Sequence, residues 1–147
     1  MALDVTLVDL YPENEYEGVA YEQRVVIRPS GGNALGAFDP DFVLDESLLG
    51  AEISVEVSLL VGDASLEHVK ETERGITPNT GHPRGYHHHT YSGRVVDVTS
   101  VDERLNRVTL DVGCGTVYFY HPTSADTQVR PGEFVRVTPV RTDIAGR

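Results

Sequence analysis

The chain has 147 residues, a length that suits one core, so we expect a single domain over residues 1–147. Its formal net charge of −11 argues against strong electrostatic binding of nucleic acid. No apolar run approaches the ~18 residues of a membrane helix, and no basic segment precedes an apolar one as in a signal peptide, so we expect no membrane contact. Cys114 is the only cysteine, which excludes an internal disulfide and predicts a cytoplasmic protein.

The negative charge is concentrated in the first part of the chain. Residues 1–83 hold 16 Asp and Glu against 4 Lys and Arg, whereas residues 84–147 hold 7 against 8. Lys70 is the only lysine. This acidic, lysine-poor composition resembles that of proteins from halophilic archaea, although a GC-rich genome also favours Arg over Lys. The resemblance implies that the acidity is an adaptation to salt; the alternative is an acidic binding face.

The first half of the chain predicts three strands separated by turn-forming segments. Apolar and polar residues alternate over 3–10, and a second strand is expected over 22–28, with an acidic connection between them. The clearest strand is 52–61, where five apolar side chains share one face. Short helical pieces are expected at 45–49, which a glycine closes, and at 63–74, where Asp63 is a candidate cap and Gly75 follows.

Six histidines form the one chemically suggestive set, and three of them are consecutive. We expect residues 75–90 to be an exposed, histidine-rich loop. In an extended chain His87 and His89 project to one side, and His82 or His121 is a candidate third ligand. Imidazole binds zinc, nickel and copper, so the sequence predicts either such a divalent transition metal or, on the simpler interpretation, a polar loop without cofactor.

Four further strands are expected in the second half, over 91–100, 107–112, 116–120 and 133–140. Within 116–120 the pattern places Tyr118 and Tyr120 on the face opposite Val117 and Phe119. Cys114 lies between two glycines at a sharp turn. No catalytic signature surrounds it, so a structural thiol is favoured over a nucleophile.

The hairpin, glycine-marked bend, Pro-Gly-Glu turn and closing strand of the second half resemble an OB-fold domain. The resemblance implies an all-β, mostly antiparallel, OB-like β-barrel with at most one or two short helices. We expect the barrel core over 51–143 and extra N-terminal strands and loops over 1–50. OB domains commonly carry a helix between their third and fourth strands, and here the helix candidate falls earlier, so another small barrel or a sandwich is the alternative.

The resemblance implies ligand binding on one face of the barrel, often of single-stranded nucleic acid. The outward-facing candidates for that face are two tyrosines and three cations: Arg94, Arg107, Tyr118, Tyr120 and Arg136. Because the net charge repels nucleic acid, we expect first a non-enzymatic binding or assembly module, whose partner is a protein or a second copy. Single-stranded nucleic acid and a metal at the histidines are the alternatives.

Overall fold

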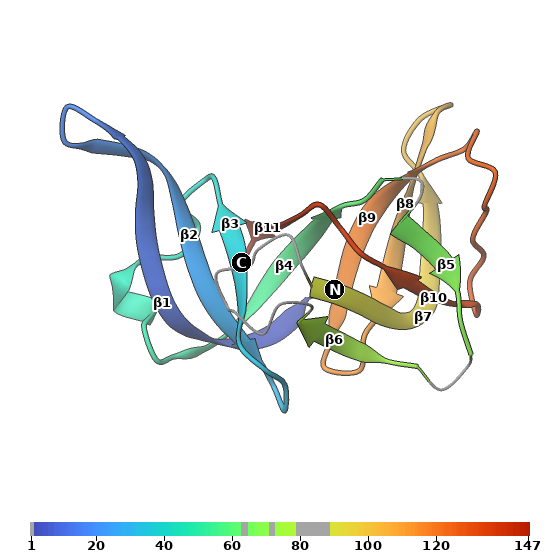
Figure 1. Ribbon diagram of the computed structural model, residues 1–147, viewed down its shortest axis with the longest axis horizontal. Helices are drawn as coiled ribbons and strands as arrows, with labels where there is room; N and C mark the ends of the chain where they lie inside the picture. The colour runs from blue at the N-terminus through green and yellow to red at the C-terminus, as the bar shows by residue number, and fades with distance from the viewer. Residues whose placement is uncertain (1, 63–64, 71–72, 79–88) are drawn as a thin grey trace.

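The computed structural model describes residues 2–62, 65–70, 73–78 and 89–147. It is an all-β structure in two lobes lying side by side, which confirms the predicted fold class (Figure 1). No helix in the described ranges is long and apolar enough to cross a membrane.

The first lobe is a closed ring of five strands, ordered β1–β2–β3–β11–β4 and back to β1. Its members are β1 (Leu3–Tyr16), β2 (Val19–Pro29), β3 (Leu35–Asp39), β11 (Arg141–Gly146) and β4 (Glu52–Leu60). Only the β3–β11 contact is parallel. This is the strand order of an OB-fold barrel, and closure removes exposed sheet edges.

The membership of this ring differs from the sequence-based prediction. We expected the strands before residue 51 to be additions to a barrel over 51–143, but β1, β2 and β3 are three of the five ring members. The short 3-10 helix η1 (Glu46–Leu48) therefore lies between the third and fourth strands, where OB domains commonly carry a helix. Once the ring is counted from β1, the apparent departure in helix position disappears.

The second lobe repeats the same order. It contains β7 (His89–Ser100), β8 (Leu105–Asp111), β9 (Thr116–Pro122), β10 (Phe134–Val137), β5 (Leu66–His68) and β6 (Gly75–Pro78). β9 runs parallel to the end of β4, and β10 pairs antiparallel with β7 and with β5. Because β5 follows β4 in the chain, the β4–β5 segment closes this lobe as β11 closes the first. Each lobe is thus completed by a strand from the other half.

The two halves also share details of register. Both first strands carry a β-bulge, between Leu7 and Asp9 in one and between Val95 and Asp97 in the other. The residues inside these bulges are both exposed valines, at positions 8 and 96. These correspondences make the chain an internal structural repeat, which the sequence does not display as a repeated motif.

One cluster of buried apolar side chains serves both lobes. Tyr91 and Phe119 are its largest fully buried members. The Tyr91 hydroxyl lies 2.8 Å from Thr142 Oγ1, which links β7 to β11 and satisfies a polar group inside the core. Burial raises the pKa of Tyr91, so this hydroxyl stays protonated.

The helix predicted over 63–74 is wrong in the described part of that range. Leu66–His68 form β5, paired with Val135–Val137 of β10. Leu66 is buried in the common core. A short helix gains little stability by itself, so pairing with β10 and burial of Leu66 outweigh the weak local helical pattern. The other predicted piece is confirmed as η1, which Asp45 caps by accepting a hydrogen bond from the Ser47 amide at 2.9 Å.

Candidate functional site

The outer face of β8 and β9 brings together three of the residues predicted from the sequence. Arg107 on β8 lies opposite Tyr120 on β9. The Arg107 guanidinium lies 4.1 Å from the centre of the Tyr118 ring, a cation–π contact. The rings of Tyr118 and Tyr120 meet edge to face at 5.9 Å. The predicted alternation therefore places these three side chains in one cluster.

The cluster continues across the neighbouring strands. Ser58 of β4 lies opposite Tyr118, and Leu60 of β4 lies opposite Arg141 of β11. A pocket of about 310 Å³ opens here, and its wall includes the following side chains: Ser58, Leu60, Val61, Tyr120, Arg141 and Asp143. The Val140 amide donates to the Leu60 carbonyl at 2.8 Å, which holds Val140 beside this pocket.

We call this area the Tyr120 surface, defined by Leu60 and Tyr120 with Arg107 and Arg141 at its rim. The two apolar side chains are 58% and 44% exposed. Leu60 and Arg141 are not among the site residues predicted from the sequence. One signal was available, because Leu60 is apolar at a position in phase with Ser58 and Glu56, on the otherwise polar face of its strand.

Arg141 is held in place by two neighbours. Its Nε donates to Asp143 Oδ1 at 2.6 Å. Its guanidinium lies 4.7 Å from the centre of the Phe38 ring, and Arg24 lies at the same distance from that ring. These two cations cover Phe38, which is consequently buried. Arg24, Phe38 and Arg141 thus form one stacked group in the first lobe, and the exposed ring beside Arg141 is that of Tyr120 on β9.

Partial burial raises the pKa of Tyr118, and the neighbouring Tyr120 hydroxyl acts in the same direction. A hydrogen bond with Ser58 and the charge of Arg107 oppose that shift. Tyr118 therefore stays neutral at physiological pH. It acts as a rigid support for Arg107 and Tyr120.

Arg136 and Arg94, which the sequence grouped with this face, are placed elsewhere. Arg136 on β10 donates to Glu67 at 2.9 Å and also pairs with Glu73. These hydrogen bonds, with Glu73 the stronger influence, raise the pKa of Arg136. Arg94 lies opposite Asp111, at the far end of β8 from Arg107. The two carboxylates already satisfy Arg136, so it is a structural cation.

The histidine prediction falls partly outside the described residues, where His82 and His87 lie. His89 and His121 are both buried. His121 donates from Nε2 to the Thr127 carbonyl oxygen at 2.6 Å. Across residues 2–62, 65–70, 73–78 and 89–147, no three His, Cys, Asp or Glu side chains are grouped so that they could hold a metal.

The structure also differs from the predicted exposed loop over 75–90 at both ends of that range. Gly75–Pro78 form β6, and residues 89 and 90 begin β7, so these positions are strands. They pair with each other in antiparallel register. His89 is buried instead of exposed because this pairing carries it into the core.

Cys114 lies in the β8–β9 turn and is half-buried. Burial raises the pKa of its thiol, and the charges of Asp111 and Asp4 act in the same direction. A nucleophilic cysteine needs a lowered pKa, so this environment favours the structural role predicted from the sequence.

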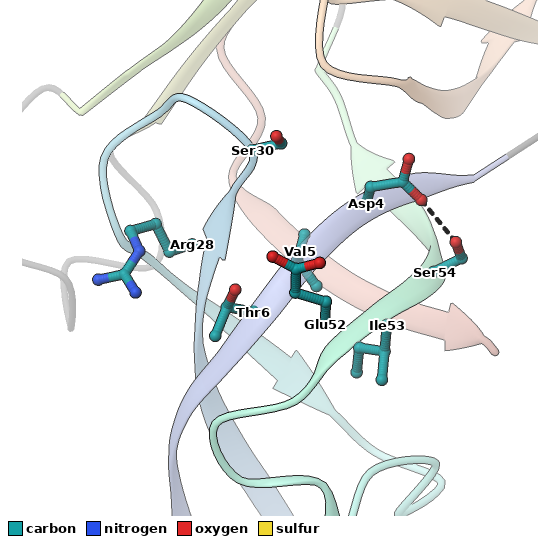
Figure 2. A pocket seen from close by; sticks show the side chains of 8 residues that line it. All are labelled: Asp4, Val5, Thr6, Arg28, Ser30, Glu52, Ile53 and Ser54. Carbon is teal, nitrogen blue, oxygen red and sulfur yellow. Dashed lines mark hydrogen bonds between the residues drawn. The ribbon is translucent and has the colours of Figure 1, made fainter.

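A second pocket, of about 290 Å³, lies where the ends of β1, β2 and β4 meet. Figure 2 shows its two carboxylates, Asp4 and Glu52, with Arg28 extending away from both. Asp4 accepts a hydrogen bond from Ser54 at 2.5 Å. The polar lining contains no exposed aromatic or aliphatic anchor comparable to Tyr120.

No family model and no curated protein matches the chain. Among solved structures, the chain is similar to the cytoplasmic molybdate-binding protein ModG in its molybdate-bound crystal form, with 16% identity and a TM-score of 0.49. The match covers 96% of this chain and 91% of the other. A likeness at this level does not extend to the ligand.

Proposed function

We propose that this protein is a non-enzymatic binding module that captures a protein segment on the Tyr120 surface. The observation that carries the proposal is the pocket of about 310 Å³ beside exposed Tyr120 and Leu60. Tyrosine and arginine are enriched at the energetic centres of protein interfaces. An exposed apolar patch with a polar rim is typical of a docking surface.

The arrangement also suits binding because its parts are fixed in advance. β4, β9 and β11 are neighbours in the sheet, so their outer side chains sit on a rigid scaffold. Arg107 is supported by the Tyr118 ring and Arg141 by Asp143. A preformed surface loses less conformational entropy when a partner binds.

Selection of displayed peptides against the wild-type chain tests this proposal. The selected peptides should bind at least about 10-fold more weakly to Tyr120→Ala, because removing an aromatic anchor typically costs ~2 kcal/mol. Val101→Ser is the control, since Val101 is also an exposed apolar residue but lies in the β7–β8 turn. Peptides that bind wild type and Tyr120→Ala equally would contradict the proposal.

A second candidate is single-stranded nucleic acid, favoured by the stacking of Arg107 on Tyr118 beside exposed Tyr120. Stacking of a base on a tyrosine contributes ~1–3 kcal/mol. Fluorescence anisotropy with labelled oligonucleotides decides between the two. No binding at micromolar protein in low salt removes this candidate, whereas binding that weakens in Tyr120→Ala and depends little on salt supports it.

A further inference from the structure

We infer that the segment captured by the Tyr120 surface is the tip of the β1–β2 hairpin of a second copy of this chain. This inference rests on the proposed function, because it names the partner of that same surface. The tip consists of Tyr16, Glu17, Gly18 and Val19.

The tip presents two neighbouring apolar side chains, those of Tyr16 and Val19, to solvent. Tyr16 and Val19 are directly opposite in the register of β1 and β2, so their side chains share one face. They are 66% and 55% exposed. The two residues between them, Glu17 and Gly18, have positive φ angles of 52° and 80°, which defines a tight hairpin turn. A two-residue turn therefore holds an aromatic and an aliphatic side chain side by side.

The hairpin extends beyond the barrel as an arm. β3 pairs with β2 only from Gln23 to Ile27, so residues 19–22 of β2 pair with β1 alone. Figure 1 shows this arm at the end of the molecule away from β9. The arm of one copy thus lies on a different part of the molecule from the Tyr120 surface, and the contact joins unlike surfaces of two copies.

Charge and apolar character are complementary between the two surfaces. Residues 11–22 contain four Glu and no Lys or Arg. Glu17 is exposed at the tip itself. The Tyr120 surface carries Arg107 at its rim, in a chain whose net charge is −11. Arg141 also lies there, but it is paired with Asp143, which lines the same pocket, so the positive charge of this surface comes mainly from Arg107. The acidic apolar tip and the apolar pocket beside Arg107 attract each other, whereas most other faces of two such acidic molecules repel.

A head-to-tail contact between unlike surfaces has a distinctive consequence. A pair formed by one such contact retains one unused tip and one unused surface, so association continues into rings or open chains. Two variants that each lack one surface cannot self-associate, but a mixture of them forms a pair that goes no further.

Sedimentation velocity over a concentration series provides the test. Wild type should grow in mean mass with concentration, and Tyr16→Ala and Tyr120→Ala should each associate at least 10-fold more weakly. An equimolar mixture of the two variants should form a heterodimer, because one supplies the tip and the other the Tyr120 surface. Val101→Ser should behave as wild type, since residue 101 is exposed in the β7–β8 turn and belongs to neither the tip nor the Tyr120 surface.

A monomeric wild type at every concentration, or Tyr16→Ala associating as strongly as wild type, overturns the inference. A mixture that remains monomeric overturns it as well. If the monomeric chain still binds selected peptides in a way that Tyr120→Ala abolishes, the proposed function stands and only the identity of the partner is wrong. If the binding of no selected peptide depends on Tyr120, both the proposed function and the inference about its partner are wrong.

Discussion

Asp39 shows how a single polar residue supports the first lobe from inside. Its buried carboxylate accepts hydrogen bonds from Gln23 Nε2 at 2.7 Å, the Val43 amide at 2.9 Å and the Leu44 amide at 2.8 Å. Gln23 also donates to the Leu44 carbonyl at 2.6 Å. The network ties the segment after β3 to β2, which fixes the connection toward η1.

Replacing this carboxylate should be costly. Asp39→Ala should lower the free energy of unfolding by about 2–4 kcal/mol, because it leaves buried donors without an acceptor. Urea unfolding of both proteins measures the difference. The control is Asp41→Ala, whose side chain is exposed two residues away and whose loss should cost less than ~0.5 kcal/mol. Equal costs for the two variants would contradict this account of Asp39.

Cys114 should react slowly with thiol reagents. Since burial and two nearby carboxylates raise the pKa of its thiol, less thiolate is present at pH 7 to 8 than in the unfolded chain. Alkylation should therefore be slower in the native protein and should accelerate as the pH rises beyond the normal thiol range. Alkylation that is faster in the native protein than in the urea-unfolded chain would show that folding lowers the pKa of this thiol, which would contradict the account.

The sequence predicts some of the site residues better than others, for a physical reason. The period of two along β9 places Tyr118 and Tyr120 outward without any tertiary information. Arg141 belongs to the site only because β11 crosses to the first lobe, and no local pattern encodes that crossing. Arg136 pairs with Glu67 and Glu73, and the sequence does not predict this pairing because the two carboxylates lie far away along the chain.

Gly93 marks a close approach of β7 to its neighbour strand. A Cβ at this position would lie 2.0 Å from the carbonyl oxygen of Asp111, and backbone cannot yield by that amount cheaply. Gly93→Ala should therefore destabilise the protein by about 2 kcal/mol or more. Thermal unfolding of the wild type and of Gly93→Ala measures this loss of stability. Gly62→Ala is the matched control, because the nearest atom to its Cβ is a serine hydroxyl at 3.9 Å, and it should be nearly neutral.

The strands with strict alternation were predicted within a few residues, as β4, β8 and β9 show. β3 was missed because it is buried throughout and carries no alternation. β5 and β11 were missed because they are short closing strands, specified by pairing partners in the other half. Local periodicity thus predicts the class of fold, whereas the exchange of closing strands requires long-range contacts.

The acidity of the whole molecule bears on its stability in salt. With a net charge of −11, carboxylate repulsion opposes the compact state, and salt screens it. We expect the melting temperature to rise between low and molar KCl. A melting temperature that is flat or falls over that range would count against a halophilic origin of the composition. The proposed surface does not depend on that origin.

Mapping the binding face by nuclear magnetic resonance tests the proposed function most directly. A ¹⁵N-labelled chain would be titrated with an unlabelled peptide selected for binding. We predict that the largest shift changes occur at the amides of Leu60, Tyr120 and Arg141, and that Tyr120→Ala abolishes them. Largest changes around Asp4 and Glu52, or along β5 and β10, would contradict the assignment of the Tyr120 surface as the binding site.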